Sequence, residues 1–181
     1  MKIALALPVL LLLVASGCVK ESFAEVRPET ITGTTYTHPD HGFSITVPRE
    51  WEVNDSGFFG TAVMFLSPRG EGDAFQENVN VVVEKLPRNM TAEEYSNAAI
   101  GTMERIITDF KLLDSGRELI GGEEAFGGIY SMRLGKIRTK NIYYAIVQGR
   151  RAYVITCAAH PDTFNQYKGV LSGIAKTFRV R

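Results

Sequence analysis

The sequence has little cysteine and no excess of charge of either sign. Two cysteines in 181 residues are too few for a disulfide framework or a four-cysteine zinc site. The 20 Lys and Arg side chains balance the 20 Asp and Glu side chains, which argues against a generally basic nucleic-acid-binding protein and against an acidic solvating tail. A content of 45% hydrophobic and 22% charged residues is typical of one folded domain with its own core.

Motifs of familiar catalytic sites are also missing. The chain contains no Gly-x-Ser-x-Gly elbow, no phosphate-binding loop and no His-Glu-x-x-His motif. Cys157 lies in the apolar run 152–159, and no Cys or His stands at the spacing of a nucleophile pair. We interpret it as a buried, unreactive thiol. The sequence therefore predicts a protein that is not an enzyme and has no cofactor.

The neutral total conceals an uneven distribution of charge along the chain. Residues 1–124 carry 10 basic and 19 acidic side chains, whereas residues 125–181 carry 10 basic side chains and a single acid, Asp162. Asymmetry of this kind either marks an interaction surface or reflects two halves that interleave in one sheet and neutralise each other.

The first residues have the features of an export signal. Lys2 precedes the apolar run Ile3–Val14. At 1.5 Å per residue this run spans about 18 Å, which is too short for a bilayer core of about 30 Å. The run ends in Val-Ala-Ser-Gly-Cys18, which resembles the bacterial lipoprotein signal, where the Cys is lipidated and becomes the mature N-terminus. The alternative is ordinary cleavage after Ala24, which would discard Cys18.

The lipoprotein interpretation divides the chain into three parts. Residues 1–17 are predicted to be the signal peptide, and residues 18–34 to be the lipidated Cys18 followed by a polar tether without periodicity. Residues 35–181 would form the folded domain. We expect the protein outside the cytoplasm, attached through its lipid to the cell membrane or the outer membrane.

Residues 35–181 show mainly strand patterns. Phe43, Ile45 and Val47 alternate with polar residues, which predicts a half-buried strand. Apolar runs predict further strands at 62–67 and 79–85, and a four-strand meander at 111–120, 123–134, 137–148 and 151–159 with glycines in its turns.

Two segments have helical periodicity. Thr91-Ala-Glu-Glu94 is a capping box, and a helix from there to about Phe110 would bury the stripe Tyr95, Ala99, Met103, Ile106 and Phe110. A last helix, with Asp162 as its N-cap, would bury Phe164, Tyr167, Leu171, Ile174 and Phe178. The expected fold class is α+β, with a central, largely antiparallel sheet of about six or more strands flanked by helices.

Both ends of this domain resemble a known family. Residues 36–51 combine an aromatic residue, a polar turn, Gly-Phe-Ser-Ile, a proline and Trp51, and look like the opening motif of PsbP-like domains. Residues 164–178, with the ending Lys-Thr-Phe-Arg, resemble that family's last helix and final strand. The resemblance implies a sheet sandwiched between helices and a protein that acts by binding partners. The family includes extrinsic photosystem II proteins and bacterial lipoproteins, and a Ran-binding eukaryotic protein shares its fold.

The histidines suggest an alternative function. His38-Pro39-Asp40-His41 and His160-Pro161-Asp162 contain all three imidazoles of the chain. His38, Asp40 and His41 are candidate ligands for a metal site in a metal-binding or hydrolytic extracytoplasmic module, and the fold decides whether His160 joins them. Against this, Pro-Asp is ordinary turn and N-cap chemistry.

An acidic loop gives a second, weaker metal candidate. It carries Glu71, Asp73, Glu77 and Asn78 but lacks the spacing of an EF-hand. We interpret it as a solvated loop.

Basic residues surround two turns of the predicted meander. Alternate hairpin turns lie at opposite ends of a sheet, so we expect two separate patches. Each patch holds an anionic partner or lipid headgroup, or else protects the sheet from unwanted strand pairing. The candidate partner-binding residues are Arg133, Lys136, Arg138 and Lys140 at one turn, and Arg150 and Arg151 at the next. The predicted function is a non-enzymatic binding or assembly role at a membrane-associated protein partner, with no nucleic acid involved.

Overall fold

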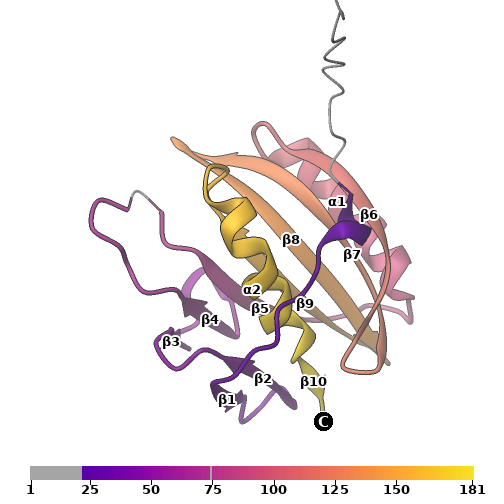
Figure 1. Cartoon of the computed structure of the whole chain (residues 1–181). Helices are drawn as coiled ribbons and strands as arrows, with labels where there is room; N and C mark the ends of the chain where they lie inside the picture. Colours follow the sequence, from indigo (N-terminus) through magenta and orange to yellow (C-terminus); the bar gives the residue numbers. More distant parts are fainter. Residues whose placement is uncertain (1–21, 74) are drawn as a thin grey trace, which may run out of the picture.

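The computed structural model describes residues 22–73 and 75–181, which form two α-helices and ten strands in two antiparallel sheets (Figure 1). This confirms the predicted α+β class. The larger sheet contains, in spatial order, β3 (Glu52–Asn54), β4 (Val63–Leu66), β5 (Asn78–Lys85), β9 (Arg151–Ala159), β8 (Ile137–Gln148), β7 (Glu123–Leu134) and β6 (Lys111–Ile120). The smaller sheet contains β1 (Thr34–Thr37), β2 (Phe43–Val47) and β10 (Arg179–Val180) in the order β1-β2-β10.

The meander β6–β9 forms with the bounds predicted from its hydrophobic pattern. Its first turn is Gly121-Gly122, where both residues have positive φ, 63° and 94°. Glycine adopts this conformation without steric cost, so the Gly-Gly pair allows a tight reversal between two long strands. The regular antiparallel register of β7, β8 and β9 then fixes which side chains share a face of the sheet.

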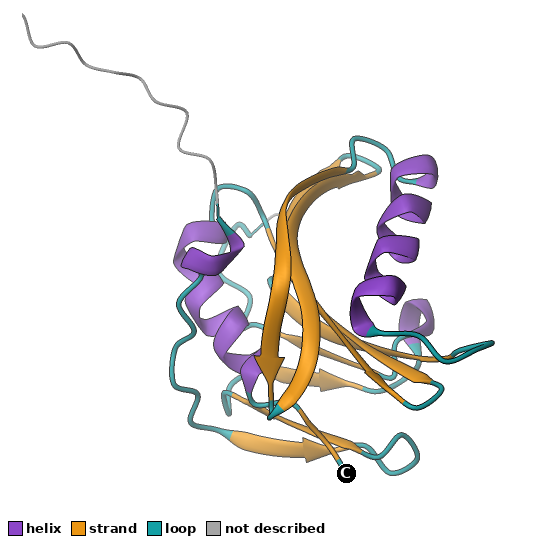
Figure 2. Cartoon of the chain, turned by 90° about the vertical axis from the view of Figure 1, so that its right-hand side faces the viewer, coloured by secondary structure: helices purple, strands orange, loops and turns teal. Residues whose placement is uncertain are grey.

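The two helices lie on opposite faces of the larger sheet, as Figure 2 shows. Helix α2 (Phe164–Lys176) packs against one face and covers the main hydrophobic core. Helix α1 (Ala92–Ile106) packs on the other face, where its Ile100 forms a smaller cluster with Tyr130 and Tyr143 of the sheet. Every residue of both clusters lies between Phe23 and Val180, so residues 22–181 contain the whole described core.

The second sheet was not predicted, and β2 is more deeply buried than its alternation indicated. Ser44 faces away from the Phe43 side of the strand but is only 6% exposed. The cause is that β2 is the central strand of the smaller sheet, paired with β1 on one edge and with β10, from the far end of the chain, on the other.

Helix α1 begins as predicted and ends early. The Thr91 hydroxyl accepts the Glu94 amide hydrogen and the Glu94 carboxylate accepts that of Thr91, which completes the capping box. The helix stops at Ile106, because the chain must turn to enter β6 at Lys111. The predicted stripe is therefore wrong at Ile106, which is 73% exposed. The side chains that are buried on this helix are Ser96 and Ile100.

The start of α2 also differs from the prediction. The N-cap residue is Thr163, and Asp162 is exposed beside His160. The Thr163 hydroxyl donates to the carboxylate of Glu77, which is 3% exposed. Glu77 is thus a buried acceptor at the beginning of α2 and does not belong to a solvated loop. Acidic side chains in this position interact favourably with the helix dipole.

The segment predicted as a tether packs against the domain from Phe23 onward. Phe23 lies in a short 3₁₀ helix, η1 (Phe23–Glu25), is 6% exposed and lies against the ring of Tyr144. Further along, the Glu29 amide donates to the Gly169 carbonyl of α2, beside which the segment runs (Figure 1). The segment comes closest to α2 at Gly173, where a Cβ atom would overlap the Glu29 carbonyl oxygen. Glycine at this position therefore makes the packing possible. Cys18 lies outside the described residues.

Candidate functional site

The turn between β7 and β8 carries basic and apolar side chains that face solvent. We call Leu134, Lys136, Ile137 and Arg138 the β7–β8 tip. All four are exposed, and Leu134 and Ile137, at 62% and 42%, pair directly across the hairpin. Lys136, Ile137 and Arg138 line a shallow hollow of about 210 Å³ together with His160. Neither Lys136 nor Arg138 has an acidic partner among residues 22–73 and 75–181.

The other two basic residues predicted at this turn have internal contacts. The Arg133 Nε atom lies 2.7 Å from Asp109 Oδ2, so this pair ties β7 to the loop that follows α1. The Lys140 Nζ atom lies 4.6 Å from the ring centroid of Phe164, the first residue of α2. The structure therefore brings the four predicted residues to one end of the sheet, and leaves the charges of Lys136 and Arg138 the most accessible.

Arg150 and Arg151 do not form a common patch, because Arg150 lies in the turn before β9 and the two guanidinium groups contact different loops. Arg150 donates to the carbonyl oxygens of Leu86 and Pro87, at 3.1 and 2.6 Å, and holds the loop before α1. Arg151 donates to the His41 carbonyl at 3.3 Å and supports the turn between β1 and β2. Both guanidinium groups thus satisfy backbone carbonyls of this chain.

The three histidines are divided between two ends of the molecule. His38 Nδ1 accepts the amide hydrogens of Asp40 and His41, which stabilises the turn, and the rings of His38 and His41 lie 4.3 Å apart. Burial, His38 and the Arg151 guanidinium together lower the pKa of His41. His160 follows β9 at the end opposite Arg151, about 30 Å away along the strand.

This placement gives the metal alternative no support. In the part of the chain that the structure describes, no three His, Cys, Asp or Glu side chains are gathered closely enough to hold a metal ion. His38 and His41 have a structural role in their turn.

An exposed pair of phenylalanines was missed in the sequence. Phe58 and Phe59 lie in the short 3₁₀ helix η2 (Phe58–Gly60), 53% and 77% exposed, with ring centroids 4.1 Å apart. Phe59 has φ of +53°, a left-handed conformation that is unfavourable for a bulky residue. The signal available in the sequence was Gly57-Phe-Phe-Gly60, two aromatic residues between glycines.

We expect Phe59→Gly to raise the free energy of unfolding by about 1 kcal/mol, because the left-handed conformation costs a residue with a Cβ about 1–2 kcal/mol. Phe58→Gly is the matched control: its φ is ordinary, so glycine should destabilise the domain by about 0.5–1 kcal/mol. Urea unfolding of both variants measures the difference. If Phe59→Gly were the less stable of the two, Phe59 would have a packing role that outweighs its strain.

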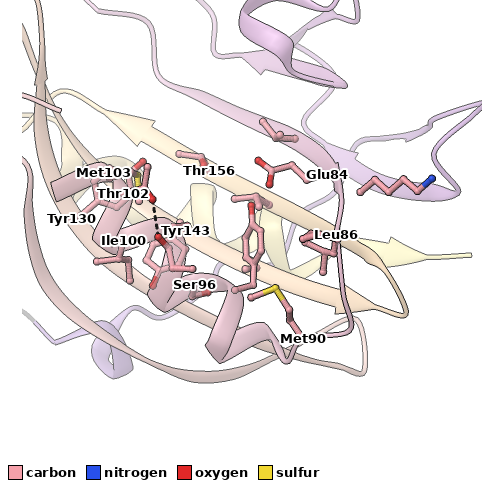
Figure 3. A pocket seen from close by; sticks show the side chains of 18 residues that line it. Glu84, Leu86, Met90, Ser96, Ile100, Thr102, Met103, Tyr130, Tyr143 and Thr156 are labelled. Atoms are coloured by element: carbon pink, nitrogen blue, oxygen red, sulfur yellow. Dashed lines mark hydrogen bonds between the residues drawn. The ribbon is translucent and has the colours of Figure 1, made fainter. Parts of the chain in front are cut away.

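A groove between α1 and the larger sheet is the main cavity near this helix. Its volume is about 600 Å³ (Figure 3). The helix supplies Tyr95, Ser96, Ala99 and Met103 to its lining, the sheet supplies mainly Val82, Tyr130, Tyr143, Ala145, Val154 and Thr156, and Leu86 and Met90 close one end. Most of these side chains are apolar, which is typical of sites for small organic molecules.

The polar groups of the groove are tyrosine, serine and threonine hydroxyls, together with the charged side chains of Glu84 and Lys85. Burial raises the pKa of Tyr143 to about 12, and the nearby Ser96 hydroxyl opposes this rise. Burial also raises the pKa of Tyr95, with a further contribution from the Glu84 carboxylate beside it. These hydroxyls therefore stay protonated at neutral pH and provide neutral hydrogen-bonding groups.

The described residues form an α+β domain in which an antiparallel sheet lies between two helices. Its surface carries the β7–β8 tip and the apolar groove beside α1. The chain belongs to the PsbP family, since the family model matches residues 33–180. The resemblance inferred from residues 36–51 and 164–178 is thereby confirmed. No curated protein sequence matches the chain significantly.

Solved structures that share this fold include the following three. Cyanobacterial PsbP (CyanoP) from Synechocystis sp. PCC 6803 is 15% identical with a TM-score of 0.63, over 82% of this chain and 92% of its own. LpqN, involved in cell envelope biogenesis of Mycobacterium tuberculosis, is 14% identical with a TM-score of 0.60, over 81% and 89%. The Ran-binding protein Mog1p of Saccharomyces cerevisiae is 12% identical with a TM-score of 0.56, over 83% and 96%.

Neither α1 nor α2 combines the length and apolar character that crossing a bilayer requires, and the same holds for every helix within residues 22–73 and 75–181.

Proposed function

We propose that this chain is an exported, lipid-anchored PsbP-like protein that binds a membrane-associated protein partner and catalyses no reaction. The partner would present acidic side chains to the β7–β8 tip. Support comes from the sequence around Cys18, from membership of the PsbP family over residues 33–180, and from the exposed charges of Lys136 and Arg138.

The observation that carries this proposal is the composition of the β7–β8 tip. Exposed leucine and isoleucine between basic side chains give a small apolar centre with a charged rim, which is the anatomy of a protein interface. The hollow between Lys136, Arg138 and His160 has the charge to receive a carboxylate of the partner.

The position of Phe23 would keep the folded domain close to a lipid on Cys18. The Phe23 amide donates to Asp114 Oδ2 at 2.7 Å, and Asp114 pairs with Ile129, near the middle of β7. Five residue steps separate Cys18 from Phe23, a reach of at most about 18 Å. A lipid on Cys18 would therefore hold the larger sheet close to the bilayer.

Replacement of Cys18 tests the anchor. A Cys18→Ala chain should no longer incorporate a fatty-acid analogue and should move from the membrane fraction to the soluble extracytoplasmic fraction. Ser16→Thr, which leaves the cysteine in place, is the control and should remain in membranes. A Cys18→Ala protein that still fractionates with membranes and still carries the label refutes the anchor.

Charge reversal at the β7–β8 tip tests the partner surface. Lys136→Glu combined with Arg138→Glu should reduce the yield of crosslinked partner in native membranes about tenfold or more, since two reversed charges oppose an acidic surface. Arg49→Glu with Arg69→Glu makes the same change at two exposed sites elsewhere and should leave the yield unchanged. Equal capture by both double variants would place the partner on another surface.

A further inference from the structure

The exposed phenylalanine pair of η2 lies at one end of the larger sheet. The pair stands between β3 and β4, and the Ala62 amide just after it donates to the Val81 carbonyl of β5. β5 then ends at Lys85, which is paired with Arg151, the first residue of β9. The β7–β8 tip lies at the opposite end of the same sheet, where β9 finishes. We call four side chains of the first end the η2 end: Phe58, Phe59, Lys85 and Arg151.

The turn that presents the two rings is held by hydrogen bonds. The Thr61 amide and hydroxyl both donate to the Phe58 carbonyl, at 3.1 and 2.7 Å, and the Gly60 amide donates to the Gly57 carbonyl at 3.0 Å. Phe59 keeps its left-handed φ of +53° within this turn. Strained residues persist where the surrounding structure holds them, and they concentrate at functional sites. The exposure of the two rings is therefore imposed by the turn.

Two like charges stand side by side at the same end. Lys85 and Arg151 are directly opposite each other on β5 and β9, where like charges disfavour strand pairing. Both residues are exposed, and neither forms an ion pair within residues 22–73 and 75–181. An anionic group placed between these two side chains would remove their repulsion, so the pair favours an anionic partner.

Acidic side chains also lie near this end, so its net charge is small. The Glu84 carboxylate lies beside the Tyr95 hydroxyl, and the Asp55 carboxylate lies beside the Tyr36 hydroxyl. Asp40 adds a third acid on the turn between β1 and β2. Charge alone would therefore hold a partner weakly. We expect the phenylalanine rings to supply most of the binding and the basic pair to select the charge of the partner.

We infer that the η2 end binds the surface of a lipid bilayer that contains anionic phospholipid. Phe58 and Phe59 would enter the boundary between headgroups and acyl chains, and Lys85 and Arg151 would contact headgroup phosphates. Segments that bind membrane surfaces combine apolar and basic side chains in this way. A stable protein interface buries about 800 Å² on each partner, which is far more than two exposed rings provide. A bilayer accepts such a small apolar group because it needs no complementary shape.

The lipid anchor brings the bilayer within reach but does not select an end of the domain. Phe23 lies beside the middle of β7, so a lipid on Cys18 can approach either end of the larger sheet. The phenylalanine pair would direct the η2 end to the bilayer and hold the β7–β8 tip about 30 Å away from it. The partner would then be bound through its part outside the bilayer. This orientation rests on the proposed function, whereas bilayer binding by the η2 end does not.

Vesicle flotation tests bilayer binding on residues 22–181, which contain both hydrophobic cores and lack Cys18. The vesicles consist of phosphatidylcholine alone or of equal parts of phosphatidylcholine and phosphatidylglycerol. Wild-type protein should float with the mixed vesicles, and Phe59→Gly should reduce the bound fraction about tenfold. Because this variant relieves backbone strain, its loss of binding would not reflect a folding defect. Ile106→Ser is the control, since Ile106 is 73% exposed at the far end of α1, and should bind as wild type does.

The basic pair is tested through the choice between the two vesicle types. Lys85→Gln with Arg151→Gln should abolish the preference for the mixed vesicles, because the phosphate contacts of both side chains are lost. Arg49→Gln with Arg69→Gln removes two exposed charges elsewhere and should keep the preference. A preference that survives in the Lys85 and Arg151 variant would refute the part of the inference that assigns headgroup contacts to this pair.

Insertion of the rings is measured by fluorescence quenching. The tryptophan of Phe59→Trp should be quenched by brominated phospholipid in the mixed vesicles. Trp51 of the wild-type protein is only 7% exposed and should not be quenched. Equal quenching in both proteins would show that the vesicles contact another surface or unfold the domain.

Three results would overturn the inference. Wild-type protein could fail to float with the mixed vesicles, or Phe59→Gly could bind them as tightly as wild type does. Alternatively, light scattering could detect a dimer that Phe59→Gly abolishes in the absence of vesicle binding, which would assign the rings to a second copy of the chain. None of these results touches the anchor, which the labelling and fractionation of the Cys18→Ala chain test separately.

Discussion

Phe43→Ala is expected to lower the free energy of unfolding by about 3–5 kcal/mol, which is a large share of the 5–15 kcal/mol typical of a whole domain. Phe43 is completely buried on the central strand of the smaller sheet. Its ring stacks on Phe178 at a centroid distance of 5.1 Å and meets Tyr153 edge-on at 6.2 Å. Alanine would leave a cavity where β2, β9 and the residues after α2 meet, so the smaller sheet would lose part of the packing that joins it to the larger one.

The measurement is denaturant unfolding followed by the fluorescence of Trp51, the single tryptophan of the chain, which is 7% exposed. Phe58→Ala removes the same atoms from a ring that is 53% exposed, and should change the free energy of unfolding by no more than about 0.5 kcal/mol. If Phe43→Ala and Phe58→Ala lowered the free energy of unfolding by similar amounts, the packing of Phe43 would not be what joins the two sheets.

The interior of the fold was predictable where local pattern and tertiary contact agree. The strands of the meander are long, they contain continuous apolar runs such as residues 142–147, and Gly121 and Gly149 lie at the reversals. Neighbouring hairpin strands pair with each other, so sequence order alone gives their spatial order. The capping box at Thr91 was likewise a local signal that needs no distant contact.

Features that depend on distant segments were not predictable. Strand β10 has two residues, and its pairing with β2 joins the two ends of the domain. Phe23 is buried against Tyr144, although its neighbours in sequence are polar and without period. Ser44 and Glu77 have the composition of exposed sites, and are buried because elements far away in the chain cover them.

For the candidate site, the basic residues of the β7–β8 tip were predictable from the sequence. Which of them are already paired with an acidic side chain of the same chain was not. Arg133 and Lys136 are equally basic in sequence, yet Arg133 contacts Asp109 and Lys136 does not contact an acid within the described ranges. Arg150 and Arg151 are adjacent, yet Arg150 contacts the Pro87 carbonyl and Arg151 the His41 carbonyl, two loops that are far apart in the sequence. The groove could not be predicted, because its existence depends on how far α1 extends over the sheet, and the periodicity of the helix does not contain that information.

Cys157 is expected to react with a thiol reagent at least about a thousandfold more slowly in the folded protein than in the unfolded chain, because labelling requires an opening that costs 5 kcal/mol or more. Cys157 is completely buried, and its Sγ atom lies 3.4 Å from the Leu171 carbonyl oxygen, to which it donates. Burial raises the pKa of the thiol far above its ordinary value, so the reactive thiolate does not form in place. Residues 22–181 contain no other cysteine, so labelling followed by mass spectrometry reports this site.

The same burial predicts how stability depends on pH. The pKa of Cys157 is higher in the folded protein than the value of about 8.5 expected in the unfolded chain. Below pH 8.5 the thiol is protonated in both states, so its contribution to the free energy of unfolding is fully present. Above that pH the unfolded state loses a proton that the folded state keeps, and the free energy of unfolding should fall by up to about 1.4 kcal/mol per pH unit. The nearby Tyr130 and Tyr144 also have raised pKa values, but unfolded tyrosines titrate near pH 10. In Cys157→Ala the decline should therefore begin about 1.5 pH units higher. An unchanged profile in this variant, or rapid labelling of the native protein, would show that the thiol reaches solvent without unfolding.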